Sequence, residues 1–98
     1  MASEWEGDWE TDFGDLTIKP DGKGLKGTYD SRGGTLTGVA YGTEFYGTWH
    51  QFYTDRPGVK GGRFYLCLDE EGDFEGHWNY GNRMGPPWDG DWEGTKDD

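Results

Sequence analysis

Near its beginning the chain reads Trp5-Glu6-Gly7-Asp8-Trp9, with an apolar residue, a glycine and an aromatic residue at alternate positions. The pattern returns as Leu25-Lys26-Gly27-Thr28-Tyr29, Phe45-Tyr46-Gly47-Thr48-Trp49, Phe74-Glu75-Gly76-His77-Trp78 and Trp88-Asp89-Gly90-Asp91-Trp92. Alternate residues of a strand point to one face of the sheet. A helical period does not fit this spacing, and glycine is unfavourable inside a helix. The repeat therefore predicts β-strands whose apolar face contains glycine where the sheet curves tightly.

Turn residues separate the copies, as in Lys19-Pro20-Asp21-Gly22 and Asp55-Arg56-Pro57-Gly58. They delimit strands near residues 4–12, 15–19, 24–29, 35–41, 44–53, 62–68, 73–79 and 88–95. Short connections favour an antiparallel meander, and closing it into a barrel removes exposed edges. We expect an all-β fold, a small eight-stranded antiparallel meander β-barrel formed as one domain over residues 1–98. A two-layer β-sandwich is the alternative.

The strand pattern also predicts which side chains fill the interior. The inner face should carry Trp5, Trp9, Phe13, Leu16, Ile18, Leu25, Tyr29, Leu36, Phe45, Trp49, Phe64, Leu66, Leu68, Phe74, Trp78, Trp88 and Trp92. Strands this short with so many inward rings predict an interior packed with side chains.

Composition excludes several classes of protein. The 98 residues are 17% aromatic, which is too rich for a disordered chain, and the formal charge of -11 argues against direct nucleic-acid binding. The single cysteine, Cys67, forbids an internal disulfide. The first residues have neither a basic start nor an apolar stretch, so we expect a cytoplasmic protein without membrane contact.

Candidate catalytic groups do not converge in the sequence. His50, His77 and Cys67 all fall on the predicted outer face, and neither histidine has a partner at metal-ligand spacing. Asp69-Glu70-Glu71-Gly72-Asp73 lacks the longer ligand pattern of an EF-hand loop and is interpreted as a tight turn. We therefore expect no enzyme, no cofactor and no metal site.

Charge is unevenly distributed along the chain. Residues 19–63 carry seven bases and four acids, a net charge of +3, whereas the remainder carries two bases and sixteen acids, a net charge of -14. If the last strand pairs with the first, an acidic outer wall should place these carboxylates side by side: Glu4, Glu6, Asp8, Glu10, Asp12, Asp89, Asp91 and Glu93.

The acidic wall admits three interpretations. The first is a binding module that engages a basic protein surface, for example as an inhibitor that mimics nucleic acid, because clustered charge speeds encounter. The second is solubility or halophilic adaptation, with no function in the wall. The third places the function elsewhere: a small ligand, sugar or apolar, would bind at a tryptophan-rich barrel mouth formed by Trp5, Trp88, Trp92 and Tyr29. The polarised charge also predicts self-association.

Two resemblances accompany these residues. The stretch from Gly7-Asp8-Trp9 to Gly27-Thr28-Tyr29 resembles the first strands of avidin-like and calycin barrels, which implies a ligand site near Thr11, Asp15, Tyr29 and Ser31 and a basic residue, Lys96, against the first Trp. Of those four site positions, Tyr29 and Ser31 match in kind. Over most of its length the chain is similar to a Gly/Trp-repeat β-domain of uncharacterised bacterial proteins, through Glu71-Gly72-Asp73-Phe74 and Trp92-Glu93-Gly94-Thr95. That similarity implies a fold and no chemistry.

Overall fold

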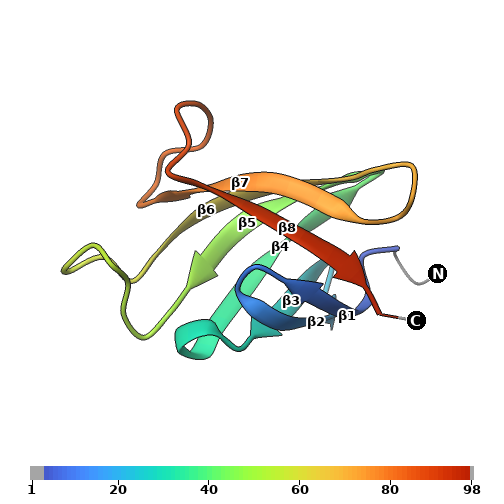
Figure 1. Cartoon of the computed structure of the whole chain (residues 1–98), viewed down its shortest axis with the longest axis horizontal. Coiled ribbons are helices and arrows are strands. Elements are labelled where there is room, and N and C mark those ends of the chain that lie inside the picture. Colours follow the sequence, from blue (N-terminus) through green and yellow to red (C-terminus); the bar gives the residue numbers. More distant parts are fainter. Residues whose placement is uncertain (1–3, 98) are drawn as a thin grey trace.

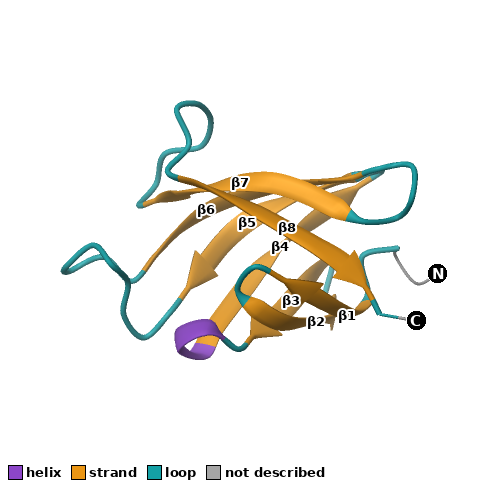
Figure 2. Cartoon of the chain, viewed as in Figure 1, coloured by secondary structure: helices purple, strands orange, loops and turns teal. Residues whose placement is uncertain are grey.

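The protein folds as a closed eight-stranded antiparallel β-barrel in meander order, as the sequence predicts (Figure 1). The structure, a computed structural model, describes residues 4–97. The strands are β1 (Gly7–Thr11), β2 (Gly14–Asp21), β3 (Gly24–Tyr29), β4 (Gly34–Tyr41), β5 (Glu44–His50), β6 (Gly61–Leu68), β7 (Phe74–Tyr80) and β8 (Gly90–Lys96). A three-residue 3-10 turn, η1 (Ser31–Gly33), joins β3 to β4 (Figure 2). Within residues 4–97 no helix has the length and apolarity needed to span a membrane.

Aromatic rings facing glycines hold neighbouring strands close together. Tyr29 on β3 stands opposite Gly34 on β4, Trp49 opposite Gly62, Trp78 opposite Gly90 and Phe74 opposite Gly94. At Gly34, Gly90 and Gly94 an added Cβ would press against the facing aromatic side chain, and at Gly62 it would first meet the backbone carbonyl of Asn79. A ring lying over a cross-strand glycine covers the backbone that the missing side chain leaves open. These four glycines, of which Gly90 belongs to the repeat, are thus places where large rings fit inside a narrow barrel.

The core agrees closely with the predicted inner face. Of the seventeen predicted residues, thirteen are buried, and Phe13, Leu68 and Trp78 pack partly buried against them. Trp88 is the exception, because β8 begins at Gly90 and leaves Trp88 in the preceding loop. There its ring stacks on that of His77, with centroids 5.3 Å apart, on the outside of β7.

Two strand limits differ from the prediction by three residues, and the others differ by two or fewer. The first strand begins at Gly7, because the chain turns at Glu4 and Trp5 and folds the Trp5 ring inward. The fifth strand ends at His50, because Gln51 donates its N–H to the carbonyl of Lys60 and begins a long loop. These departures leave segments outside the ladder at both ends of the barrel.

In the meander, successive connections alternate between the two ends of the barrel. The loops after β5 and β7, the turn after β1 and η1 lie at one end, called the mouth, and both termini lie at the other, called the closed end (Figure 1). Asp69 caps the tight turn between β6 and β7 at the closed end, where its carboxylate accepts the N–H groups of Glu71 and Asp73. This turn was the expected structure of that acidic stretch.

Candidate functional site

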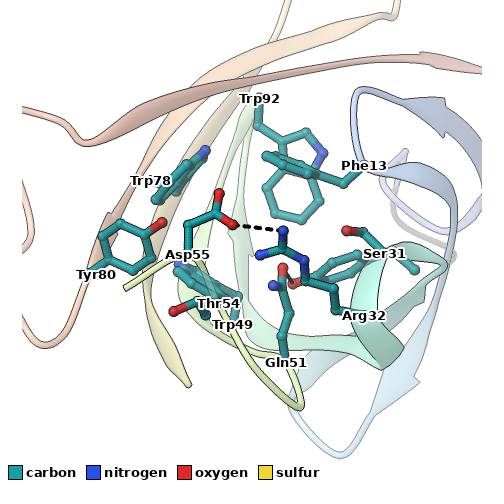
Figure 3. A pocket seen from close by; sticks show the side chains of 11 residues that line it. Phe13, Ser31, Arg32, Trp49, Gln51, Thr54, Asp55, Trp78, Tyr80 and Trp92 are labelled. Carbon is teal, nitrogen blue, oxygen red and sulfur yellow. Dashed lines mark hydrogen bonds and ion pairs between the residues drawn. The ribbon is translucent and has the colours of Figure 1, made fainter. Parts of the chain in front are cut away.

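A pocket of about 110 Å³ opens at the mouth of the barrel (Figure 3). We call it the mouth pocket. It is lined by aromatic side chains and a smaller set of polar ones: Phe13, Tyr29, Trp49, Trp78, Tyr80 and Trp92, with Ser31, Arg32, Gln51, Thr54 and Asp55. An apolar lining with a few converging polar groups is the usual composition of a small-molecule site.

Most rings of the mouth pocket lie near the ends of strands that run in the same direction along the barrel. In a meander β1, β3, β5 and β7 all run toward the same end. The aromatic residues at or just beyond those ends, Phe13, Tyr29, Trp49 and Trp78, therefore converge at the mouth. Their rings pack edge to face, with Trp49 and Trp78 centroids 5.7 Å apart and Phe13 and Trp92 centroids 5.3 Å apart.

Polar groups at the base of the mouth pocket are fixed by hydrogen bonds. Gln51 is 8% exposed; its Oε1 accepts the Tyr29 hydroxyl at 2.9 Å and its Nε2 donates to the carbonyl of Tyr53 at 3.2 Å. Burial raises the pKa of Tyr29 above its ordinary value, so the phenol stays protonated and remains a donor at neutral pH. Trp92 also lines the pocket, and its indole Nε1 is buried with no hydrogen-bond partner among residues 4–97.

An ion pair crosses the entrance of the mouth pocket. Arg32 Nη2 in η1 lies 2.8 Å from Asp55 Oδ1 in the loop after β5. Figure 3 shows Trp78 and Tyr80 on one side of this pair and Phe13 and Trp92 on the other. The hydrogen bond to Asp55 raises the pKa of Arg32 further above its ordinary value, so the guanidinium is charged at every physiological pH.

The four residues of the predicted mouth site do not lie together in the structure. Tyr29 and Trp92 line the mouth pocket, as does Ser31. Trp5 lies at the closed end, with its ring 5.2 Å from that of Phe45 and 5.7 Å from that of Phe74. Trp88 lies outside the barrel on His77. The placement of Trp5 at the mouth is wrong, because the start of β1 and the end of β1 lie at opposite ends of the barrel.

Most of the lining was not selected from the sequence. Trp49, Trp78 and Phe13 were assigned to the interior, and the direction of alternate strands would have placed them at one mouth. Arg32, Gln51 and Asp55 come from η1 and a loop, whose conformations leave no periodic signal in the sequence.

The predicted pairing of β1 with β8 is confirmed, but the register staggers the acidic wall. Glu10 is paired with Thr95, and two residues further along the chain Asp12 lies beside Glu93. Asp89 and Asp91 precede Glu93 in the sequence, so they extend beyond the end of β1. The expected single row of carboxylates is therefore wrong in its geometry.

Several of the predicted wall residues have local partners. Asp8 accepts the Thr17 hydroxyl at 2.8 Å, and Asp91 Oδ1 lies 2.8 Å from His77 Nδ1. The Asp89 side chain is 19% exposed and lies 3.4 Å from Arg83 and 3.8 Å from Arg56. Glu4 is exposed and Glu6 is half-buried, both ahead of β1.

A smaller acidic face remains on the outside of β7 and β8. We define it as Asp12, Glu75, Asp91 and Glu93. Glu75 and Glu93 stand directly opposite each other, and over residues 4–97 neither carboxylate has an ion-pair partner. Glu75, Asp91 and Glu93 border an outer depression of about 360 Å³, which half-buried Cys67 and Tyr65 also line. Across residues 4–97 no cluster of three or more His, Cys, Asp or Glu side chains has a metal-binding arrangement.

The chain matches no protein-family model, and comparisons with curated proteins and with solved structures likewise find no match.

Proposed function

We propose that this protein is a non-enzymatic binding domain that holds a small ring-containing ligand, a sugar or an apolar molecule, in the mouth pocket. One observation carries the proposal: six aromatic rings converge on one pocket at one end of the barrel, and one of them, Tyr29, is hydrogen-bonded to the polar side chain of Gln51. Aromatic faces and edges stabilise a ring ligand, and the fixed polar groups orient it.

The difference between the two barrel ends supports this function. At the closed end Trp5 fills the interior and is 0% exposed. At the mouth the corresponding rings leave room, and η1 and the loop after β5 add polar residues to the border of the pocket. Loops on a rigid barrel are the usual carriers of binding residues.

A fluorescence titration tests the proposal. A panel of hexoses, phenol, benzyl alcohol and indole is added to the wild type, to Trp78→Ala and to Trp88→Ala. A ligand of the mouth pocket should give a saturable change that Trp78→Ala weakens at least tenfold, because Trp78 lines the pocket. Trp88→Ala is the matched control, because it removes a half-buried tryptophan outside the pocket. A flat response across the panel, or one lost only in Trp88→Ala, contradicts the proposal.

A second candidate function rests on the acidic face. Like charges directly opposite each other destabilise a strand pair, and Glu75 and Glu93 stand in that relation beside an outer depression. Such a surface suits a basic side chain of a partner protein, which would neutralise the opposed carboxylates.

Charge reversal separates this candidate from a purely solubilising surface. Glu93→Lys should stabilise the fold by about 0.2–1 kcal/mol, because the new ammonium faces Glu75. It should also weaken binding to immobilised poly-L-lysine at low salt, whereas Glu70→Lys, a reversal in the exposed β6–β7 turn, should weaken it less. Equal losses in the two variants would indicate general charge and leave no site on the acidic face.

A further inference from the structure

We propose that the ligand of the mouth pocket is a small aromatic carboxylate, held by the guanidinium of Arg32 at the position that the Asp55 carboxylate occupies in this structure. This assignment rests on the proposed function, since it names the class of ligand that the same pocket takes.

The backbone at Arg32 is held in an unfavourable conformation. Over residues 4–97 it is the only non-glycine residue with positive φ, at φ 54° and ψ 33°. Side chains with a Cβ seldom adopt this left-handed region, and asparagine or glycine would occupy it more easily. The carbonyl of Arg32 accepts the N–H of Phe52 at 3.0 Å, which ties η1 to the loop after β5. The surrounding structure thus fixes an arginine where a smaller residue would be favoured, and such positions cluster at binding sites.

The guanidinium has unused hydrogen-bonding capacity. It carries five N–H donors. Within residues 4–97 it makes one hydrogen bond, from Nη2 to Asp55 Oδ1 at 2.8 Å, and its Cζ lies 4.9 Å from the centre of the Tyr53 ring. A carboxylate that is free to approach in the guanidinium plane can accept two parallel hydrogen bonds instead of one.

The partner that occupies Arg32 is easily displaced. The Asp55 side chain is 80% exposed and that of Arg32 is 30% exposed. Ion pairs this open to solvent contribute little to stability, because water screens them and solvates the released carboxylate. The Asp55 carboxylate therefore occupies the position proposed for the ligand carboxylate and competes only weakly for Arg32.

The rest of the pocket sets the size and shape of that ligand. A volume of about 110 Å³ is well above the roughly 10–15 Å³ that a cavity needs to hold one water molecule, so the pocket has room for a small organic ligand. Trp49, Trp78, Phe13 and Trp92 form apolar walls beside the guanidinium. One aromatic ring bearing one carboxylate matches both the small volume and the chemistry of the lining.

A cation lines the mouth pocket although the whole protein is acidic. Arg32, Arg56 and Arg83 lie around the mouth with Asp55 and Asp89 as their ion-pair partners, and the same end of the barrel also carries Asp12, Asp15 and Asp30. Charges on the far side of the barrel are screened over about 8–10 Å at physiological salt. Among the described residues that line the pocket Arg32 alone is cationic, so its guanidinium is the group that an anionic ligand would meet.

The test uses benzoate and its neutral analogue benzyl alcohol, titrated into nitrogen-15-labelled protein while the Arg32 Nε–H and Trp92 indole N–H signals are followed. Benzoate should bind at least tenfold more tightly than benzyl alcohol. Arg32→Gln should abolish that preference and retain benzyl alcohol binding, since it removes charged hydrogen bonds only. Asp55→Asn should tighten benzoate binding roughly two- to fivefold, because the competing carboxylate is gone. Lys26→Gln is the control and should leave the preference intact, because it removes a positive charge from an exposed position on β3 that does not line the pocket.

The outcomes separate the two proposals. Equal binding of both compounds, or a benzoate preference that survives Arg32→Gln, overturns the carboxylate assignment and leaves the mouth pocket as a ring site. No response to benzoate, benzyl alcohol or any compound of the fluorescence panel overturns both. If Arg32→Gln loses both compounds, Asp55→Asn decides: unchanged benzoate affinity overturns the assignment, and tighter binding supports it.

Discussion

The two ends of this barrel are built from the same sequence repeat, but one end is packed with side chains and the other contains a pocket. At the closed end the Trp5 ring packs against Trp9, Phe45 and Phe74, with centroids 5.2 to 5.8 Å away. At the mouth, rings of the same kind surround a pocket that an ion pair crosses. The difference arises outside the repeat, because a terminal segment fills one end and loops border the other.

Truncation of one tryptophan at each end should give the largest difference. Trp5→Ala should lower the free energy of unfolding by about 3–5 kcal/mol, because it removes a fully buried ring from packed surroundings. Trp78→Ala should cost about 1–2 kcal/mol, because that half-buried ring borders a pocket. Denaturant unfolding measures both, and equal costs would contradict the distinction between the ends.

Two glycines of β8 offer a finer comparison. Gly94 faces the Phe74 ring at the closed end, and Gly90 faces the Trp78 ring at the mouth. Gly94→Ala should cost about 1–3 kcal/mol by overpacking, because Phe74 has no space to move into.

Gly90→Ala should cost less than Gly94→Ala, because Trp78 can move toward the mouth pocket. Thermal unfolding of the two variants ranks them. A larger cost at Gly90 would mean that the rings of the mouth are as rigidly packed as those of the closed end.

The smallest expected effect is a pH dependence that belongs to the mouth. Burial raises the pKa of Tyr29 in the folded protein above its ordinary value of 10.0. The folded state therefore keeps a proton that the unfolded state loses, so this contribution to stability is complete below about pH 10 and declines above it.

Tyr29→Phe isolates that contribution. At neutral pH it should cost about 0.5–1.5 kcal/mol through the lost hydrogen bond to Gln51, and the difference from wild type should shrink as the pH rises above 10. The pKa of Tyr65 is also raised, by its hydrogen bond to Glu44, but this contribution to the pH dependence is present in both proteins and cancels in the difference between them. A difference that stays constant from pH 8 to pH 11 would show that Tyr29 ionises as freely in the folded state as in the unfolded state.

The fold could be predicted because strand parity governs it. An apolar residue, a glycine and an aromatic residue at alternate positions share a face, and the buried rings confirm that face at all the predicted positions except Trp88. Trp88 belongs to a loop that contains Pro86 and Pro87, and parity carries no information outside a strand.

The site could be predicted only in part. Tyr29 and Trp92 were found because they lie in strands, whereas Arg32 and Asp55 meet through the conformations of η1 and a loop. Whether the acidic residues form one continuous wall depends on the register between β1 and β8, and a stagger of a few residues divides the wall. Register depends on how the barrel closes, which a single strand pattern does not encode.

The most direct test of the central claim uses the indole N–H signals of the six tryptophans as position markers during a titration with a neutral ring compound such as indole. The signals of Trp49, Trp78 and Trp92 should shift with one common dissociation constant, because these residues line the mouth pocket. Those of Trp5 and Trp9 should stay in place, because they lie in the packed closed end. Saturable shifts confined to Trp5, Trp9 or the outer Trp88, or shifts spread evenly over all six, would contradict a binding site at the mouth.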